Sequence, residues 1–253
     1  MTERAVGSSM VDRWLGTNVV AKTDFGIVGK KLGQVMEKAT GETANGRENI
    51  FKNNKPVLDK NGKQKESSVK ANQKIDYNDP ELQRQLYDLE WVDFFTGEGD
   101  RHGQNLLIKQ GKEGTKVTGI DNDMGFTEKN QGVTQGGKDP SKFPKFIDAK
   151  LAKRIMANDF TLNNYVKMLE PILPARSLEV AKARFPKVVE HAMKLIKEGK
   201  VINAKGENVL ESEGKTMEWG SEDLKKEMLE GQNKGGLLEG FWQQQQKEKA
   251  QTN

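Results

Sequence analysis

Two short apolar segments separated by a turn constrain this chain more than any other feature. Residues 106–108 and 116–120 have the composition of β-strands, and the residues between them include two glycines. The pattern predicts a β-hairpin. The polar loop Gly99–Asn105 precedes the first strand and Asp121 follows the second. A hairpin would therefore place Asn105 and Asp121 side by side.

The segment before this loop has the pattern of a buried helix. Asp79 can cap it, Pro80 suits its first turn, and its apolar residues recur at spacings of three and four: Leu82, Leu86, Leu89, Val92 and Phe95. Glycines at 97 and 99 permit a tight bend after the helix. The helix is thus expected to lead directly into Asp100.

Three side chains of this region fit the needs of phosphoryl transfer. Asp100 can accept the proton of an attacking hydroxyl, while Asn105 and Asp121 offer the oxygen ligands that Mg²⁺ prefers. Each motif alone is typical of turn chemistry and solvated charge. The ordered combination of loop, strand, turn, strand and second carboxylate indicates a site for a metal-bound triphosphate.

The same residues resemble a known family. The resemblance is to the phosphatidylinositol 3- and 4-kinases and related atypical kinases, including bacterial effector and toxin kinases, and it rests on Asp100-Arg101-His102-x-x-Asn105, Ile120-Asp121-Asn122 and Gly125-Phe126. It implies ATP and Mg²⁺ as cofactors. It further implies that Asp100 is the catalytic residue, that His102 faces the phosphates, and that Asn105 and Asp121 are the metal ligands.

A fainter resemblance extends upstream. Residues 2–16 resemble the αC helix of a kinase N-lobe, with Glu3 as the candidate glutamate, and residues 18–28 and 32–41 are expected to form two strands. The second strand resembles the hinge that contacts adenine, which implies a cofactor-binding role for Met36, Glu37 and Ala39. The resemblance covers about residues 1–41 and 82–160.

The resemblance departs from the kinase pattern at the start of the chain. A kinase N-lobe begins with a Gly-rich hairpin and a lysine strand, and neither element precedes Glu3. The chain is therefore expected to be a fragment of a longer protein, a pseudokinase, or half of a split kinase whose missing strands come from a partner chain. No lysine is assigned to the phosphates.

The expected fold class is α+β, a protein-kinase-like two-lobed fold with a truncated N-lobe and a mainly helical C-lobe. The resemblance, together with the patterns, implies four regions: a partial N-lobe (1–41), a polar insertion (42–81), the C-lobe with both loops (82–200), and a helical extension with a polar tail (201–253). The prolines at 171, 174 and 186 are expected to punctuate the helices of the C-lobe.

The composition of the chain excludes several kinds of protein and of chemistry. No apolar run is long enough to span a membrane, and the absence of cysteine excludes disulfides and thiolate chemistry. The net charge of +4 is spread along the chain, so no nucleic-acid surface is expected. The expected location is the cytoplasm, with delivery into a host cell as a bacterial effector left open.

The leading functional hypothesis is an ATP- and Mg²⁺-dependent kinase of the phosphatidylinositol 3/4-kinase-like type, acting on protein Ser/Thr or on a phosphoinositide. Two alternatives stay open. One is a catalytically incomplete kinase-like module that binds a partner or nucleotide. The other is a kinase-fold enzyme that transfers another group from ATP, such as AMP.

Overall fold

The computed structural model describes residues 1–46, 51–52, 55–58, 60–63, 70–72, 74–127, 143–210, 217–230 and 236–252. Within these ranges the architecture is mixed α and β, with seven helices and several small sheets. Residues 128–142, which include Lys129, Lys138 and Lys142, lie outside the described residues.

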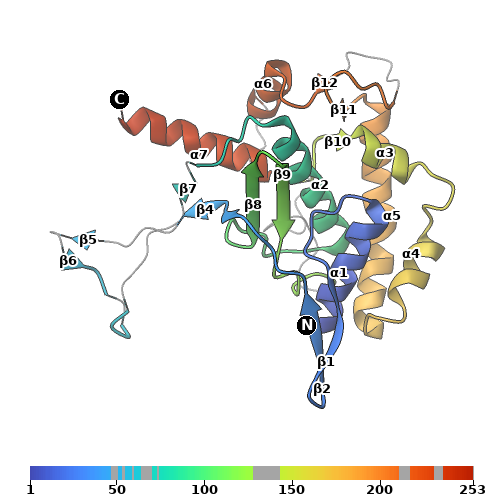
Figure 1. Ribbon diagram of the computed structural model, residues 1–253. Helices are drawn as coiled ribbons and strands as arrows, with labels where there is room; N and C mark the ends of the chain where they lie inside the picture. Colours follow the sequence, from blue (N-terminus) through green and yellow to red (C-terminus); the bar gives the residue numbers. More distant parts are fainter. Residues whose placement is uncertain are drawn as a thin grey trace.

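Helix α2 (Pro80–Thr96) lies at the centre of the molecule (Figure 1). The Asp79 carboxylate caps it by accepting the Glu81 amide at 3.0 Å, and Gly97 ends it in the left-handed region with φ 72°. The five apolar positions predicted to face the core are all buried. Because both ends are fixed, α2 delivers the following loop to a defined place.

The predicted hairpin is confirmed as strands β8 (Leu106–Gly111) and β9 (Gly114–Gly119), and it packs against α2. Strand β3 (Glu42–Thr43) joins β8 on its other side, which gives the order β3–β8–β9. The strands are longer than expected, since the two glycines of the predicted turn are the last residue of β8 and the first of β9.

Helix α1 (Thr2–Leu15) and the hairpin β1 (Thr23–Val28)–β2 (Lys31–Met36) form the N-terminal region, with the hairpin projecting from the body (Figure 1). Both strands are shorter than predicted. Val20 instead makes an isolated parallel bridge to Gly119. This bridge ties the segment after α1 to the end of β9.

The insertion contributes pairs of very short strands in the residues that the structure describes: β4 (Asn45–Gly46) with β7 (Lys70–Ala71), and β5 (Phe51–Lys52) with β6 (Lys55–Pro56).

Helices α3 (Ala149–Ile155), α4 (Leu162–Leu169) and α5 (Ala175–Lys197) form the side of the molecule on which α1 also packs (Figure 1). The expectation that Pro186 interrupts the helices is wrong, because α5 continues through it. Phe185 and Val188 are buried on either side of Pro186. Their burial in the core stabilises the helix across the proline, which cannot donate a backbone hydrogen bond.

A small parallel sheet, which the sequence patterns did not predict, joins β10 (Ile147–Asp148), β11 (Val201–Asn203) and β12 (Met217–Glu218). Helices α6 (Glu222–Glu230) and α7 (Leu237–Thr252) follow. Helix α7 includes the polar residues expected to form the tail, as far as Thr252. Leu238, Phe241 and Trp242 are buried and fix α7 to the body.

Buried apolar residues from Val11 to Trp242 belong to one hydrophobic cluster. This packing does not establish a division into two lobes. No helix among the described residues has the length and hydropathy to cross a membrane.

Candidate functional site

The register of the β8–β9 hairpin brings the two predicted metal ligands to one end of the sheet. Leu106 pairs with Gly119, and the next pair outward is joined by a hydrogen bond from the Ile120 amide to the Asn105 carbonyl at 3.0 Å. Asp121 follows directly. Asn105 and Asp121 therefore flank the same end of the hairpin, as the sequence predicts.

The loop before β8 holds the backbone of Asp100 while its side chain stays exposed. The Asp100 amide donates to Glu98 Oε1 at 3.0 Å, and the Asp100 carbonyl accepts from the His102 amide and from Asn105 Nδ2, at 2.9 and 3.1 Å. Asn105 is 7% exposed. Because its amide nitrogen is used by Asp100, its Oδ1 is the atom suited to a cation.

His102 is half-buried within the same loop. Its Nδ1 accepts a hydrogen bond from the Gln104 amide at 3.2 Å, and its carbonyl accepts from the Asn105 amide at 2.9 Å. An accepting Nδ1 is the unprotonated nitrogen of a neutral ring, so Nε2 is the nitrogen that carries the proton. That nitrogen is the one suited to donate to a phosphate oxygen.

Asp121 has an unusual backbone conformation. Its φ of 57° lies in the left-handed region, where residues other than glycine are uncommon and which asparagine and aspartate tolerate best. The neighbouring Asn122 is buried, and its Nδ2 donates to the Gly119 carbonyl at 3.3 Å. Asn122 thus anchors the turn, while the Asp121 carboxylate remains exposed.

A buried ion pair lies beneath these loops. The Arg101 guanidinium donates to both carboxylate oxygens of Asp93, at 3.0 and 2.9 Å, and both side chains are 1% exposed. Burial raises the pKa of Asp93, and the Arg101 charge opposes that rise. Bidentate geometry of this kind is the strongest form of the arginine–carboxylate pair.

Glu98 adds a second buried carboxyl to this cluster. Burial, with a smaller contribution from Asp93, raises its pKa to about 7. The Arg101 charge and the hydrogen bond from the Asp100 amide act in the opposite direction. Glu98 Oε2 has no hydrogen-bond partner in the described structure.

Four residues were predicted to contact the nucleotide from the N-terminal region: Glu3 in α1, and Met36, Glu37 and Ala39 at and after the end of β2. Glu3 is in the first turn of α1, where its carboxylate pairs with the N-terminal amine at 3.3 Å. Met36 ends β2 with 43% exposure, and the Glu37 amide donates to the Lys22 carbonyl. Within the described ranges, no hydrogen bond or ion pair connects Glu3, Met36, Glu37 or Ala39 to Asp100, Asn105 or Asp121.

The donor set fits a hard cation that is also bound by phosphate. The described residues contain no group of three or more His, Asp or Glu side chains that could hold a metal by themselves. One carboxylate and one amide oxygen at the hairpin end leave the remaining positions to phosphate oxygens and water, as Mg²⁺ requires in phosphoryl-transfer sites. Asn105 and Asp121 therefore fit Mg²⁺ bound together with a polyphosphate.

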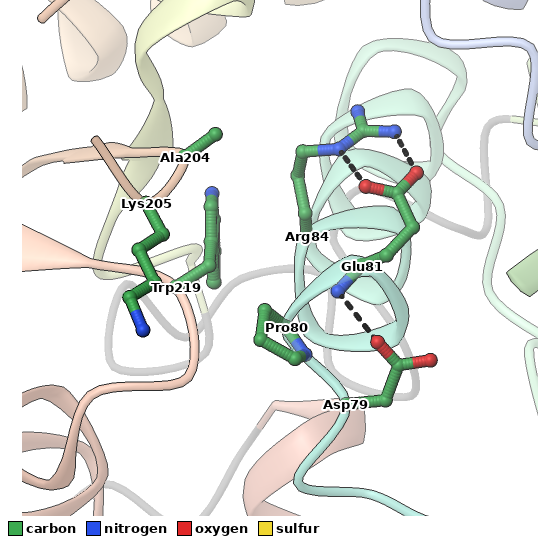
Figure 2. A pocket seen from close by; sticks show the side chains of 7 residues that line it. All are labelled: Asp79, Pro80, Glu81, Arg84, Ala204, Lys205 and Trp219. Carbon is green, nitrogen blue, oxygen red and sulfur yellow. Dashed lines mark hydrogen bonds and ion pairs between the residues drawn. The ribbon is translucent and has the colours of Figure 1, made fainter. Parts of the chain in front are cut away.

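A cavity of about 290 Å³ lies elsewhere, between the start of α2 and the β11–β12 region (Figure 2). Its arginine, Arg84, is bound by the carboxylates of Glu81 and Asp88, at 2.6 and 2.5 Å. Because both partners lie on the same helix as Arg84, this cluster stabilises α2. The cavity contains none of the predicted site residues.

Four supporting residues were not assigned a role from the sequence: Asp93, Glu98, Arg101 and Asn122. Asp93 lies between Val92 and Phe94 in the helix that was predicted to be buried. A charged residue at such a position was the signal in the sequence that could have indicated a buried ion pair. The backbone contacts of Arg101 had no such signal. They depend on how three separate segments meet.

Comparisons with known proteins add little to this geometry. No family model matches the chain, and no curated protein matches it either. Among solved structures, the chain is similar to one from the toxin–antitoxin complex of HipA, HipB and operator DNA from Shewanella oneidensis MR-1, with a TM-score of 0.39 and 14% identity. The match covers 77% of this chain and 56% of that chain, so it spans little more than half of the known protein. A likeness at this level decides neither fold nor activity.

Proposed function

We propose that this chain is an ATP- and Mg²⁺-dependent phosphotransferase with a kinase-like fold, of the phosphatidylinositol 3/4-kinase-like type. The observation that carries the proposal is the meeting of Asp100, Asn105 and Asp121 at one end of the β8–β9 hairpin. Asp100 and Asp121 are exposed, whereas Glu98, Asn105 and Asn122, which hold the loop and the turn, are buried.

Each residue has a distinct role in this proposal. Asp100 accepts the proton of the acceptor hydroxyl, and Asn105 Oδ1 and the Asp121 carboxylate hold Mg²⁺. His102 Nε2 donates to a phosphate oxygen. When bound, Mg²⁺–ATP supplies the transferable phosphoryl group and neutralises its charge.

The order of elements supports the kinase-like part of the proposal. Helix α1, the β1–β2 hairpin, the segment that enters β3, helix α2, the polar loop and the β8–β9 hairpin follow one another as the resemblance implies. In this order Met36, Glu37 and Ala39 belong to the adenine-binding hinge, and Glu3 to the αC helix.

The acceptor we propose is a protein Ser/Thr or a phosphoinositide. Lys145, which lies after the Asp121 turn in the chain, is 3.8 Å from Glu239 on α7. That pairing gives Lys145 a structural role and favours neither acceptor. The proposed location is the cytoplasm, of the producing cell or of a host cell.

We also propose a partner chain that supplies strands to the N-terminal region. The supporting observation is the β1–β2 hairpin, where Ile27 and Leu32 face each other across the strands with 73% and 68% exposure. A two-stranded hairpin with an uncovered apolar face is marginally stable alone, and added strands would cover it.

Incubation with γ-labelled ATP and Mg²⁺ tests the proposal, with phosphoinositide vesicles and a Ser/Thr protein substrate as separate acceptors. Label in one acceptor is expected, and Asp121→Asn, which keeps the shape and tolerates φ 57°, should reduce it at least about 100-fold. Asp123→Asn, two residues along the same turn, is the matched control and should keep full transfer.

Asp100→Asn separates binding from chemistry. Loss of the proton acceptor should lower turnover about 100- to 10,000-fold while nucleotide affinity stays within a few-fold of wild type. A parallel reaction with α-labelled ATP detects AMP transfer. Label from the α position in the acceptor would replace the kinase proposal with the nucleotidyl-transfer alternative, and no label from either would favour the binding module.

A further inference from the structure

Arg101 makes more contacts than its ion pair with Asp93 requires. Beyond the two bonds to Asp93, its Nη1 donates to the Asn105 carbonyl at 3.1 Å and to the Ile120 carbonyl at 2.8 Å, and its Nη2 donates to Asn122 Oδ1. The residue is 3% exposed. One guanidinium thus contacts α2, the loop that carries Asp100, and the turn that carries Asp121.

The partners of Arg101 immediately surround the proposed functional residues. Arg101 follows Asp100 in the chain, Asn105 is itself a proposed metal ligand, and Ile120 and Asn122 are the two neighbours of Asp121. A displacement of the guanidinium would therefore move both sides of the site relative to each other. Asp93 fixes the guanidinium to the most buried helix of the molecule.

The chain makes room for this arrangement at Gly119. A Cβ atom at that position would lie 3.1 Å from both Cζ and Nη1 of Arg101, which is closer than ordinary van der Waals contact. Absence of a side chain at position 119 lets the end of β9 approach the guanidinium. The hairpin end and the arginine are thus fitted to each other.

Arg84 provides the contrast. It also binds two carboxylates, Glu81 and Asp88, but both lie on its own helix. Burying a charged pair costs desolvation energy, and its best-supported use is to specify one arrangement of segments. Arg101 meets that description because its partners come from three segments, and Arg84 does not.

We propose that Arg101 is a positioning residue that couples the Asp100 loop to the Asp121 turn, so that neither is held in place without the other. The coupling is a property of the folded chain. Its consequence for metal binding and phosphoryl transfer rests on the proposed function above.

Arg101→Lys tests the coupling without removing the buried charge. Lysine keeps a cation beside Asp93 but cannot make the forked contacts to the carbonyls of Asn105 and Ile120. Hydrogen–deuterium exchange of the full chain is expected to rise at least about tenfold in peptides that cover residues 99–105 and 119–126. Arg84→Lys, the same change in the other cluster, should leave both peptides at wild-type rates.

A second pair of variants tests the coupling even if Arg101→Lys fails to fold. Asn122→Ala removes the contact between Arg101 and Asn122 Oδ1 and also the hydrogen bond from Asn122 Nδ2 to the Gly119 carbonyl. Asn122→Asp restores the acceptor oxygen for Arg101 but not the donor to Gly119, so it isolates the Arg101 contact. Faster exchange of the residue 99–105 peptide in Asn122→Ala, reversed in Asn122→Asp, is expected. Such a result would mean that a substitution in the Asp121 turn alters the Asp100 loop. A purely local effect would change exchange only in the peptide that contains position 122.

The functional readout is the Mg²⁺ concentration for half-maximal transfer from ATP. It should rise about 10- to 100-fold in Arg101→Lys, as for other residues that orient metal ligands, and stay unchanged in Arg84→Lys. Unchanged exchange in both peptides of a folded Arg101→Lys, or equal effects of Arg84→Lys, would overturn the coupling. Altered exchange in a protein that neither binds nor uses Mg²⁺–ATP would support the coupling and refute the proposed function.

Discussion

At the scale of single residues, the molecule is notable for acids buried around α2. Asp88, Glu90, Asp93 and Glu98 are each 2% exposed or less. Burial raises the pKa of all four carboxyls. Asp93 is the acid held by the bidentate contact with Arg101, whereas Glu98 keeps one oxygen without a partner. The pKa of Glu98, about 7, lies within the pH range of a denaturation experiment.

Glu98→Gln should change how stability depends on pH. The pKa of Glu98 rises from 4.5 to about 7 on folding, so the folded protein binds this proton more tightly than the unfolded chain. The wild-type free energy of unfolding should thus fall as pH rises through that window, by up to about 3 kcal/mol from this group. Glutamine does not titrate, so Glu98→Gln should not show this fall in the free energy of unfolding.

Urea denaturation of both proteins between pH 4.5 and 8 measures the difference. The stability of Glu98→Gln relative to wild type should increase as pH rises toward 7 and then level off. A difference that stays constant with pH would mean that Glu98 does not titrate in this window.

The sequence identified the candidate ligands Asn105 and Asp121, but not the buried residues Arg101 and Asn122 that hold them in place. Asn105 and Asp121 could be placed together because strand period and turn length fix which residues meet in a hairpin. The roles of Arg101 and Asn122 depend on the angle between the loop and the turn. No local pattern specifies that angle.

At the scale of elements, α2 was predictable because it has a long, regular apolar pattern with signals at both ends, and the β8–β9 hairpin because its two short apolar segments flank a glycine-containing turn. The sheet β10–β11–β12 was not, since strands of two or three residues carry no period. The continuation of α5 through Pro186 also depends on tertiary packing, which local propensity does not include.

Gly119→Ala tests the fit between hairpin and loop. The added methyl group would lie 2.9 Å from Leu89 Cδ1 and 3.1 Å from the Arg101 guanidinium, so we expect a loss of about 1–3 kcal/mol in the free energy of unfolding. Gly111→Ala is the matched control, because no atom lies within 4 Å of its added Cβ. Equal stabilities of the two variants in urea would contradict the close packing described here.

At the scale of the whole molecule, the C-terminal helix is joined to the helix that leads into the candidate site. Tyr87 donates to Glu239 Oε1 at 2.8 Å, and the Leu237 amide donates to Glu90. Trp242 Nε1 donates to the Tyr77 carbonyl at 3.2 Å. Helix α7 therefore stabilises α2 from the side opposite α1 and α5 (Figure 1).

Trp242→Ala should destabilise the protein by about 3–5 kcal/mol, because it empties a buried aromatic site and leaves the Tyr77 carbonyl without its indole partner. Thermal unfolding followed by circular dichroism measures the effect. Gln246→Ala, at an exposed position one turn further along α7, is the control and should unfold with the wild type. A small shift for Trp242→Ala would show that α7 is not part of the core.

Mg²⁺-dependent binding of ATP is the most direct test of the central claim, that the end of the β8–β9 hairpin is a metal–nucleotide site. Isothermal titration calorimetry of wild type, Asp121→Asn and Asp123→Asn with ATP, each with Mg²⁺ and with EDTA, gives the comparison. We predict binding by wild type and Asp123→Asn only when Mg²⁺ is present, and loss of that binding in Asp121→Asn. Equal Mg²⁺-dependent affinity in Asp121→Asn and wild type, or no binding by wild type, would contradict the claim.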